Sequence, residues 1–158
     1  YMAEAFDVHA FNYIVKPVTQ QKVDKIVTQL EEVINARNDK LTFRYNRELI
    51  NAYYDDIVYM ESSKRIINLV TTNMEYQFYA KINDVYDELP ELIFGKTRSG
   101  CIVNYRYVSR VDKNNVWCKR GVDGTEIRLD LGRGRYNDFM TDYTEYITSE
   151  RGKSRRLW

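Results

Sequence analysis

Basic residues stand beside serine or glycine in several segments of the sequence, including the following three. Lys64-Arg65 follow two serines, Arg98-Ser99 precede a glycine, and residues 132–135 read Gly-Arg-Gly-Arg. Arginine presents a planar fork of donors that can bond guanine O6 and N7 together, whereas lysine, serine and backbone amides mostly bind phosphate. Glycine bends the backbone and lets it approach a ligand closely. These three segments are therefore candidate contacts to DNA.

The residue types suggest different tasks for these segments. We expect Arg133, which lies between two glycines, to contact a base, and Arg98 and Ser99 to contact DNA. Lys64 and Arg65 are expected to contact mainly phosphate. Arg135 fits a solvated β-turn at least as well as a DNA contact. For every segment the alternative is an exposed turn with no ligand.

The distribution of charge supports the same interest in basic turns. The whole chain has 24 basic and 23 acidic side chains and a net charge of +1 at pH 7, which gives no sign of a polyanionic partner. Residues 96–135 differ, because they hold ten basic and four acidic side chains, and all seven glycines lie from Gly95 onward. An ordinary solvated surface could have this composition too.

Residue types that bind metals or catalyse reactions are scarce. Two cysteines, Cys101 and Cys118, and one histidine, His9, are too few for a disulfide framework, a tetrahedral zinc site or a hydrolytic triad. Both cysteines lie in predicted strands, so we expect buried, unreactive thiols. The run 132–135 lacks the lysine and hydroxyl of a phosphate-binding P-loop. We therefore expect no metal, no cofactor and no enzymatic activity.

The overall composition predicts a soluble cytoplasmic protein. The chain has 158 residues, of which 44% are apolar and 30% charged, a globular balance with enough residues for one full domain or a small domain plus a fragment. No apolar run approaches the ~18 residues that cross a bilayer, and the start of the chain lacks the features of a signal peptide. We expect no contact with a membrane.

Residues 1–39 have an α/β pattern. The run 11–15 is short, aromatic and β-branched, which predicts a strand that Pro17 ends. Thr19 is a candidate N-cap, and apolar residues then recur at spacings of three and four, which predicts a helix over about 20–36. The apolar stripe of this helix consists of Val23, Ile26, Val27, Leu30, Val33 and Ile34.

Beyond a polar linker at 35–40, the periodicity changes towards two and predicts a mainly β fold. The segments 81–89 and 136–147 carry apolar residues on one helical face and predict two short helices. Asn104 ends an apolar strand and is expected to bond turn backbone rather than a ligand. The expected strands cover 41–44, 57–60, 65–72, 75–79, 101–104, 107–111, 115–118 and 125–131.

The segment from Ala5 to Val18, with its aromatic strand and Lys16-Pro17, resembles the end of the receiver domain of a response regulator. The resemblance implies that, in a complete receiver, Lys16 contacts the phosphorylated aspartate and Tyr13 reports the phosphorylation state. The acceptor aspartate precedes this point in that fold, so we expect no phosphoryl transfer here and a cognate sensor kinase only for the full-length receiver. For the fragment, a solvated Lys16 and a packed Tyr13 are the simpler interpretation.

A second set of landmarks runs through residues 40–150. In order, these are Asp56-Ile57, Tyr59-Met60-Glu61-Ser62, Lys64-Arg65, Tyr76–Tyr79, Leu89-Pro90, Phe94, Lys96–Asn104, Val108–Val111 and Ile127–Arg133. In this order they resemble a LytTR DNA-binding domain. The resemblance implies an elongated antiparallel β fold that inserts loops into successive major grooves. It maps Arg133 onto a base-contacting arginine and places Arg98, Ser99 and Gly100 where the family commonly has a histidine, a polar or basic residue and a serine.

Together these features predict a sequence-specific double-stranded DNA-binding module of a two-component response regulator that controls transcription. Residues 1–39 would be a receiver fragment, 40–150 the DNA-binding domain, and 151–158 a basic tail that either binds phosphate or is merely solvated. The alternative is a protein-interaction or dimerisation module with no specific DNA target. Steep salt dependence of binding would favour DNA.

The segment 1–39 also predicts a homodimer. Its strand and its apolar helix face lack the sheet that covers them in a complete receiver. We therefore expect this segment to associate with its counterpart in a second copy of the chain. The alternative is that it folds back on its own β domain or lacks order.

Overall fold

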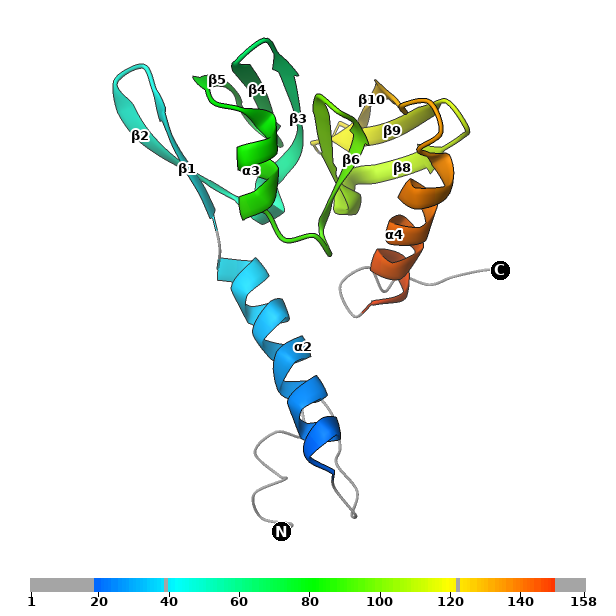
Figure 1. The fold of residues 1–158 in the computed structure, drawn as a ribbon. Helices are drawn as coiled ribbons and strands as arrows, with labels where there is room; N and C mark the ends of the chain where they lie inside the picture. The colour runs from blue at the N-terminus through cyan, green and yellow to red at the C-terminus, as the bar shows by residue number, and fades with distance from the viewer. Residues whose placement is uncertain (1–18, 39, 122, 150–158) are drawn as a thin grey trace. The chain divides into compact units, whose positions relative to one another are not determined.

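The computed structural model describes residues 19–38, 40–121 and 123–149 of the chain (Figure 1). It divides the chain into two compact units, 1–39 and 40–158. The predicted strand at 11–15, with Tyr13 and Lys16, and the tail at 151–158 lie outside the described residues.

In the first unit the described element is a helix, α2 (Gln20–Asn38), which confirms the helix predicted at this place. The Thr19 hydroxyl accepts a hydrogen bond from the backbone N–H of Lys22 at 3.2 Å, as expected of an N-cap. None of the helices in the described part of the chain is long and apolar enough to cross a membrane.

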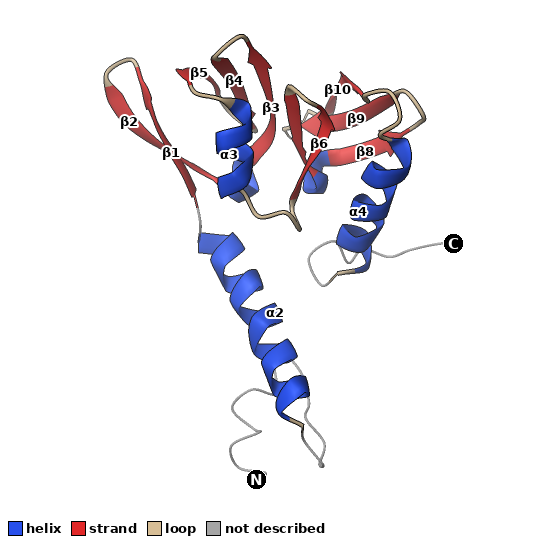
Figure 2. Cartoon of the chain, in the orientation of Figure 1, coloured by secondary structure: helices blue, strands red, loops and turns tan. Residues whose placement is uncertain are grey.

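The second unit is mainly β, as predicted, and all its strand pairs are antiparallel (Figure 2). The largest sheet has the order β5-β4-β3-β7-β6, a three-stranded sheet has the order β10-β9-β8, and β1 and β2 form a hairpin. The strands are β1 (Lys40–Tyr45), β2 (Glu48–Tyr53), β3 (Ile57–Ser63), β4 (Ile66–Thr71), β5 (Glu75–Tyr79), β6 (Phe94–Arg98), β7 (Cys101–Asn104), β8 (Val108–Val111), β9 (Asn115–Arg120) and β10 (Thr125–Asp130).

Two helices of the second unit lie where the sequence predicted them, one between β5 and β6 and one after β10. These are α3 (Ile82–Glu88), which ends just before Pro90, and α4 (Tyr136–Thr148). Two short 3-10 turns, η1 (Tyr54–Asp56) and η2 (Tyr105–Tyr107), lead into β3 and β8. The helix α4 lies beside the three-stranded sheet and contacts β6 (Figure 1).

A buried cluster joins the five-stranded sheet to the three-stranded sheet and α4. It includes Val103, Val116 and Phe139, and both thiols belong to it. Burial raises the pKa of the Cys101 thiol to about 11 and that of the Cys118 thiol to about 12. The prediction that both thiols are buried is confirmed, and the raised pKa disfavours the reactive thiolate form at neutral pH.

Asn104 takes the structural role that its position predicted. It is fully buried, and its Nδ2 donates hydrogen bonds to the backbone oxygens of Tyr54 at 3.0 Å and Ile57 at 2.9 Å. Its Oδ1 accepts a hydrogen bond from the backbone N–H of Arg106 at 2.9 Å. Asn104 thus fixes η1 against η2 and offers no group to a ligand.

Two strands escaped prediction. In β2 only Ala52 is buried, so apolar and polar residues do not alternate visibly. In β6, Gly95 and Lys96 are poor strand formers, and pairing with β7 decides the conformation. Gly95 is required there, because the Tyr105 ring fills the space where a Cβ atom would stand. The expected turn at Arg98-Ser99 is corrected accordingly: Arg98 ends β6, and the turn consists of Ser99 and Gly100.

Candidate nucleic-acid interface

The topology brings the predicted basic segments to one side of the second unit. Ser63 pairs with Ile66, so that Lys64 and Arg65 form a two-residue turn after β3. Because β3 is antiparallel to β7, the Ser99-Gly100 turn before β7 lies at the same end of the sheet. The segment 132–135, after β10, lies there too (Figure 1). We call the segments Lys64-Arg65, 98–100 and 132–135 together the basic edge.

Backbone hydrogen bonds fix the three segments relative to one another. The N–H of Ser62 donates to the Gly100 oxygen at 2.8 Å, which joins the turn after β3 to the turn before β7. The N–H of Gly132 donates to the Thr97 oxygen at 2.6 Å, which joins the third segment to β6. The basic edge is therefore one connected structure and not three independent loops.

The Lys64-Arg65 turn is exposed and has an unusual backbone. Lys64 has a φ of 60°, in the left-handed region that disfavours side chains other than glycine, asparagine and aspartate. The Ser62 hydroxyl donates to the Lys64 oxygen at 3.1 Å and so supports the turn. Both basic side chains remain exposed to solvent.

Arg98 folds back over the sheet. Its Nη2 lies 3.6 Å from Oε1 of Glu61 on β3, and each side chain is 38% exposed. Its Nη1 lies 3.0 Å from the point where a Gly100 Cβ would stand, so this glycine leaves room for the guanidinium. Only Ser99 is fully exposed in this turn. Before Arg98 contacts a base, it must leave Glu61.

The two arginines of the 132–135 segment differ in their surroundings. Arg133 is exposed and makes no ion pair with any described residue. Gly134, with a φ of 76°, supplies the left-handed backbone that turns the chain into α4. The Arg135 side chain lies over Gly132, with Cδ 3.0 Å from the position of an added Cβ. Arg133 is thus the open arginine, and Arg135 packs against its own loop.

Two further basic turns lie on this side and were not singled out from the sequence. Arg47 is exposed in the β1–β2 turn. Lys113 is exposed in the β8–β9 turn, which the hydrogen bond from the Leu131 N–H to the Asn114 oxygen places beside the 132–135 segment. A basic residue between two expected strands was a sufficient signal for Lys113. The Arg47 turn was hidden because β2 was not recognised.

The β8–β9 turn is held by a carboxylate. The Asp112 Oδ1 accepts hydrogen bonds from the backbone N–H groups of Asn114 and Asn115, both at 2.8 Å. These bonds hold the pKa of Asp112 below its usual value. The turn is therefore ordered at neutral pH.

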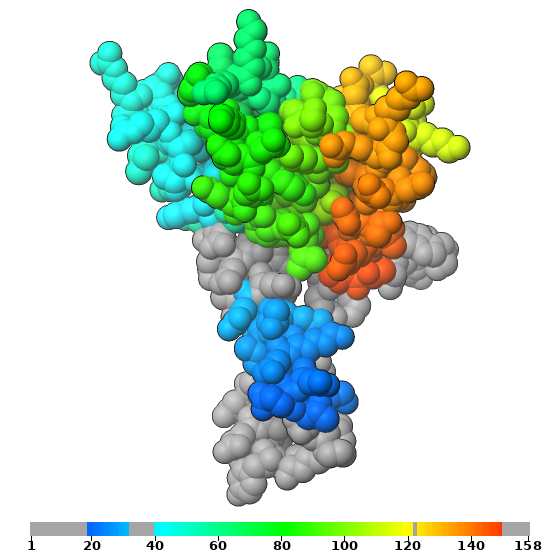
Figure 3. Space-filling view, viewed as in Figure 1, coloured from blue at the N-terminus to red at the C-terminus, as the bar shows by residue number. Residues whose placement is uncertain are grey.

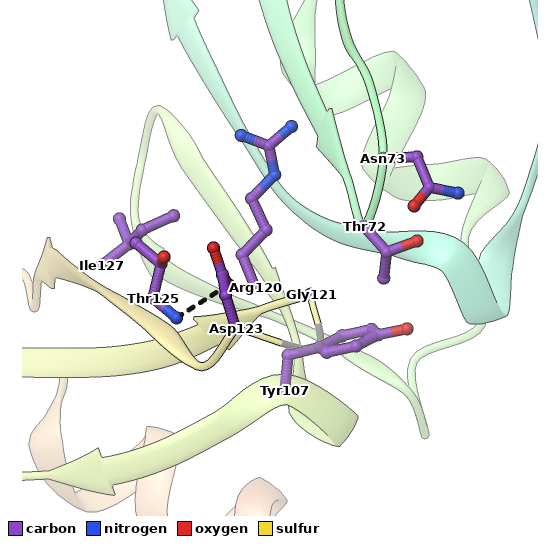
Figure 4. A pocket seen from close by; sticks show the side chains of 8 residues that line it. All are labelled: Thr72, Asn73, Tyr107, Arg120, Gly121, Asp123, Thr125 and Ile127. Carbon is purple, nitrogen blue, oxygen red and sulfur yellow. Dashed lines mark hydrogen bonds between the residues drawn. The ribbon is translucent and has the colours of Figure 1, made fainter.

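A pocket of about 610 Å³ lies at the opposite end of the sheets, beside the β4–β5 turn (Figure 4). Arg120 crosses this region: its Nε donates to the Thr71 oxygen at 2.8 Å, and its Nη1 pairs with Glu75 at 2.7 Å. Because both interactions join β9 to the five-stranded sheet, Arg120 serves structure and stands apart from the basic edge. Among the described residues no cluster of His, Cys, Asp and Glu could hold a metal ion.

Comparison with known families identifies this fold. The model of the LytTr DNA-binding domain matches residues 47–141, more than half of the chain. The chain therefore belongs to the LytTr DNA-binding domain family. The matched range contains the whole basic edge.

Individual relatives agree with this family. The chain is 26% identical over 113 residues to the transcriptional regulatory protein NatR of Bacillus subtilis, which covers 68% of this chain and 47% of that protein. It is 21% identical over 151 residues to the transcriptional regulatory protein YpdB of Escherichia coli K12, covering 86% and 62%. The chain thus spans about half to three-fifths of the length of these relatives.

A solved structure shares the fold. The LytTr DNA-binding domain of a methyl-accepting/DNA response regulator from Bacillus cereus superposes with a TM-score of 0.53 at 11% identity, covering 68% of this chain and 97% of that one. The likeness supports the mainly β, antiparallel architecture predicted from the sequence.

Proposed function

We propose that the second unit binds double-stranded DNA sequence-specifically and serves a transcription regulator of the two-component type. The observation that carries this proposal is the connected basic edge, in which hydrogen bonds through Gly100 and Gly132 hold three basic segments in one row. A row of short turns on a rigid sheet suits insertion into successive major grooves, because contacts fixed in advance cost little ordering entropy on binding.

The contacts divide by residue type and exposure. Arg133, exposed and unpaired with any described acid, reads a base, and its fork fits guanine O6 and N7. Lys64 and Arg65 neutralise phosphates. Arg98 leaves its ion pair with Glu61 and contacts DNA instead. Ser99 is already exposed and contacts the duplex directly. Arg135 contributes through the shape of its loop and at most one phosphate.

The regulator works as a homodimer in this proposal. Residues 1–39 are the end of a receiver, and in a full-length receiver Lys16 and Tyr13 respond to phosphorylation by the cognate sensor kinase. Relatives named as transcriptional regulators, of which this chain spans about half to three-fifths, support a role in the control of transcription.

The test is selection of bound sequences from random duplex DNA, followed by affinity measurements on the selected site. Arg133→Ala should weaken specific binding by about 1–3 kcal/mol and relax the preference at one base position. Lys64→Ala should weaken binding to all sequences alike and reduce the slope of log K against log salt by about 0.9. Arg106→Ala removes an exposed charge from η2, at the other end of β7, and serves as the control.

Two outcomes would count against this assignment. If Lys64→Ala changes the preferred sequence while Arg133→Ala does not, the two roles are reversed. If the wild-type chain selects no sequence and its association with DNA responds weakly to salt, the protein-interaction module becomes the better description.

A further inference from the structure

We propose that the β1–β2 hairpin is a fourth DNA-contacting element, whose Arg47 binds a phosphate in the duplex that flanks the specific site. The inference rests on the proposed function and extends it from the specific site to the neighbouring sequence. It concerns a turn for which neither the sequence pattern nor the basic edge as defined above assigns a contact.

The chain path places the hairpin tip beside the basic edge. The strand β2 runs from the tip to Tyr53, where η1 begins, and η1 leads directly into β3 at Ile57. From there β3 runs in the opposite direction and ends at the Lys64-Arg65 turn. Both tips therefore lie at the same end of the unit (Figure 1). In the space-filling view the cyan hairpin, the green β3–β4 turn and the orange segment after β10 all project from this side (Figure 3).

The hairpin is held firmly against the five-stranded sheet. The ring of Phe43 stacks on Phe78 of β5 with centroids 4.5 Å apart. The rings of Tyr45 and Tyr76 meet edge to face at 5.1 Å. Leu41 on β1 is buried as well. The tip is thus presented from a packed base, so that a contact there does not require a loose loop to be ordered.

The backbone of the tip points to a role for the Arg47 side chain. Asn46 and Arg47 have φ values of 50° and 68°, and Tyr45 pairs with Glu48, so the turn has two central residues with positive φ. Such turns favour Asn at the first position and Gly at the second. Here an arginine occupies the glycine position despite the backbone cost, as Lys64 does in the neighbouring turn.

Arg47 also has the electrostatic freedom that a phosphate contact needs. It is exposed and forms no ion pair with any described residue, unlike Arg98, Arg110 and Arg120. Its charge therefore complements a polyanion without first breaking an internal pair. Lysine or arginine on a duplex releases condensed counterions, which is the main source of sequence-independent affinity.

The position of the hairpin predicts where the phosphate lies. The hairpin packs on β5, which lies two strands from β3. Neighbouring strands are about 4.8 Å apart and packed layers about 10 Å apart, and each base pair advances the duplex by about 3.4 Å. The two contacts should lie about 10–15 Å apart, so Arg47 should reach the backbone about three to five base pairs beyond the nucleotides contacted by Lys64. The basic edge continues in the other direction, so the flank is engaged on one side only.

The experiment uses the full chain and a series of duplexes that carry the selected site with flanks of unrelated sequence, lengthened stepwise on either side. Fluorescence anisotropy gives the affinity of the wild type, Arg47→Gly and Arg106→Ala. Glycine suits the positive φ, so Arg47→Gly should keep its hairpin, which circular dichroism and a thermal melt verify. Arg47→Ala is the second variant and removes the charge without adding backbone freedom.

Wild-type affinity should rise when one flank reaches about three to five base pairs and should not respond to the other flank. On the extended duplex both Arg47 variants should bind about fivefold more weakly at 0.15 M salt, and the salt slope should fall by about 0.9, the contribution of one phosphate contact. On the core duplex they should match the wild type. Arg106→Ala should match it throughout.

The inference is overturned if folded Arg47 variants bind every duplex as the wild type does, or if they lose affinity on the core duplex as well. A wild-type chain that binds no duplex specifically would instead contradict the proposed function. If the chain selects a specific site but the Arg47 variants bind every duplex as the wild type does, the proposed function stands and the hairpin does not belong to the interface.

Discussion

The Arg98–Glu61 pair controls the charge that the basic edge presents to a ligand. At 3.6 Å and 38% exposure on each side, the pair is largely solvated and contributes little to stability. Its effect on binding is larger, because it keeps one arginine folded back and places an acid beside the turn before β7. Glu61 is thus a natural candidate for tuning affinity.

Glu61→Gln should strengthen DNA binding by about three- to tenfold at low salt, since the change frees Arg98 and removes one repulsive charge. The free energy of unfolding should change by less than about 1 kcal/mol, as for other exposed pairs. Anisotropy titrations and urea denaturation measure the two effects. Glu88→Gln, at the far end of α3, makes the same change in net charge. An equal gain in that control would reduce the Glu61 effect to overall charge.

Sequence reasoning at the residue scale succeeded where the neighbours along the chain determine the role. Asn104 stands at the end of an apolar strand, and the prediction that it bonds turn backbone is confirmed by its three hydrogen bonds. The state of Arg98 could not be predicted in this way. Its partner Glu61 lies opposite Cys101 through the β3–β7 register, which is a long-range fact.

At the scale of elements, the same distinction explains β2 and β6. Strands with a buried alternating face, such as β4 and β9, were evident from their β-branched and aromatic residues. The strand β2 is mostly exposed, and β6 contains Gly95 because the Tyr105 ring needs the space. Both strands form because they pair with neighbouring strands, β2 with β1 and β6 with β7. Consequently the Arg47 turn also escaped notice, since a turn is recognised only when both its strands are.

Arg120 adds two polar interactions to the buried apolar cluster that joins the two larger sheets. Its Nε–H satisfies the Thr71 oxygen, and Thr71 is only 7% exposed, whereas the Glu75 carboxylate at the other end is 67% exposed in its side chain. The two bonds therefore differ in value. The bond to Thr71 is the important one, because an unsatisfied buried oxygen is costly, while an exposed pair is worth little.

Arg120→Met should lower the free energy of unfolding by about 1–3 kcal/mol, because it retains the aliphatic stem but leaves the Thr71 oxygen without its donor. Glu75→Gln should lower it by less than about 1 kcal/mol. Urea denaturation of both variants measures the difference. DNA affinity of the folded Arg120→Met protein should be unchanged, because the basic edge lies at the other end of the sheets. Equal losses in both variants would show that the exposed pair, and not the bond to Thr71, joins the sheets.

At the scale of the whole chain, the helix of the first unit has an apolar face that can pair with a second copy. The helix α2 has 19 residues, and Val27 on its apolar stripe is 45% exposed. Helices in proteins gain most of their stability from packing an apolar face and little from intrinsic propensity. A second copy of the same helix offers an apolar face of matching spacing.

We therefore expect residues 1–39 to dimerise the chain, with a concentration dependence set by mass action. Light scattering should find a dimer for the full chain and a monomer for residues 40–158, which form a compact unit of their own. Val27→Lys and Leu30→Lys should dissociate the dimer, because each places a charge in the apolar interface. Gln29→Lys adds the same charge at an exposed polar position of α2 and should leave the dimer intact. A dimer brings two basic edges to one duplex. The full chain should therefore bind a direct repeat of the selected site much more tightly than residues 40–158 do, whereas on a single site the two should differ little. Two results would contradict this role for the first unit. One is a full chain that stays monomeric at all concentrations, and the other is a dimer that persists with Val27→Lys and Leu30→Lys but is lost with Gln29→Lys.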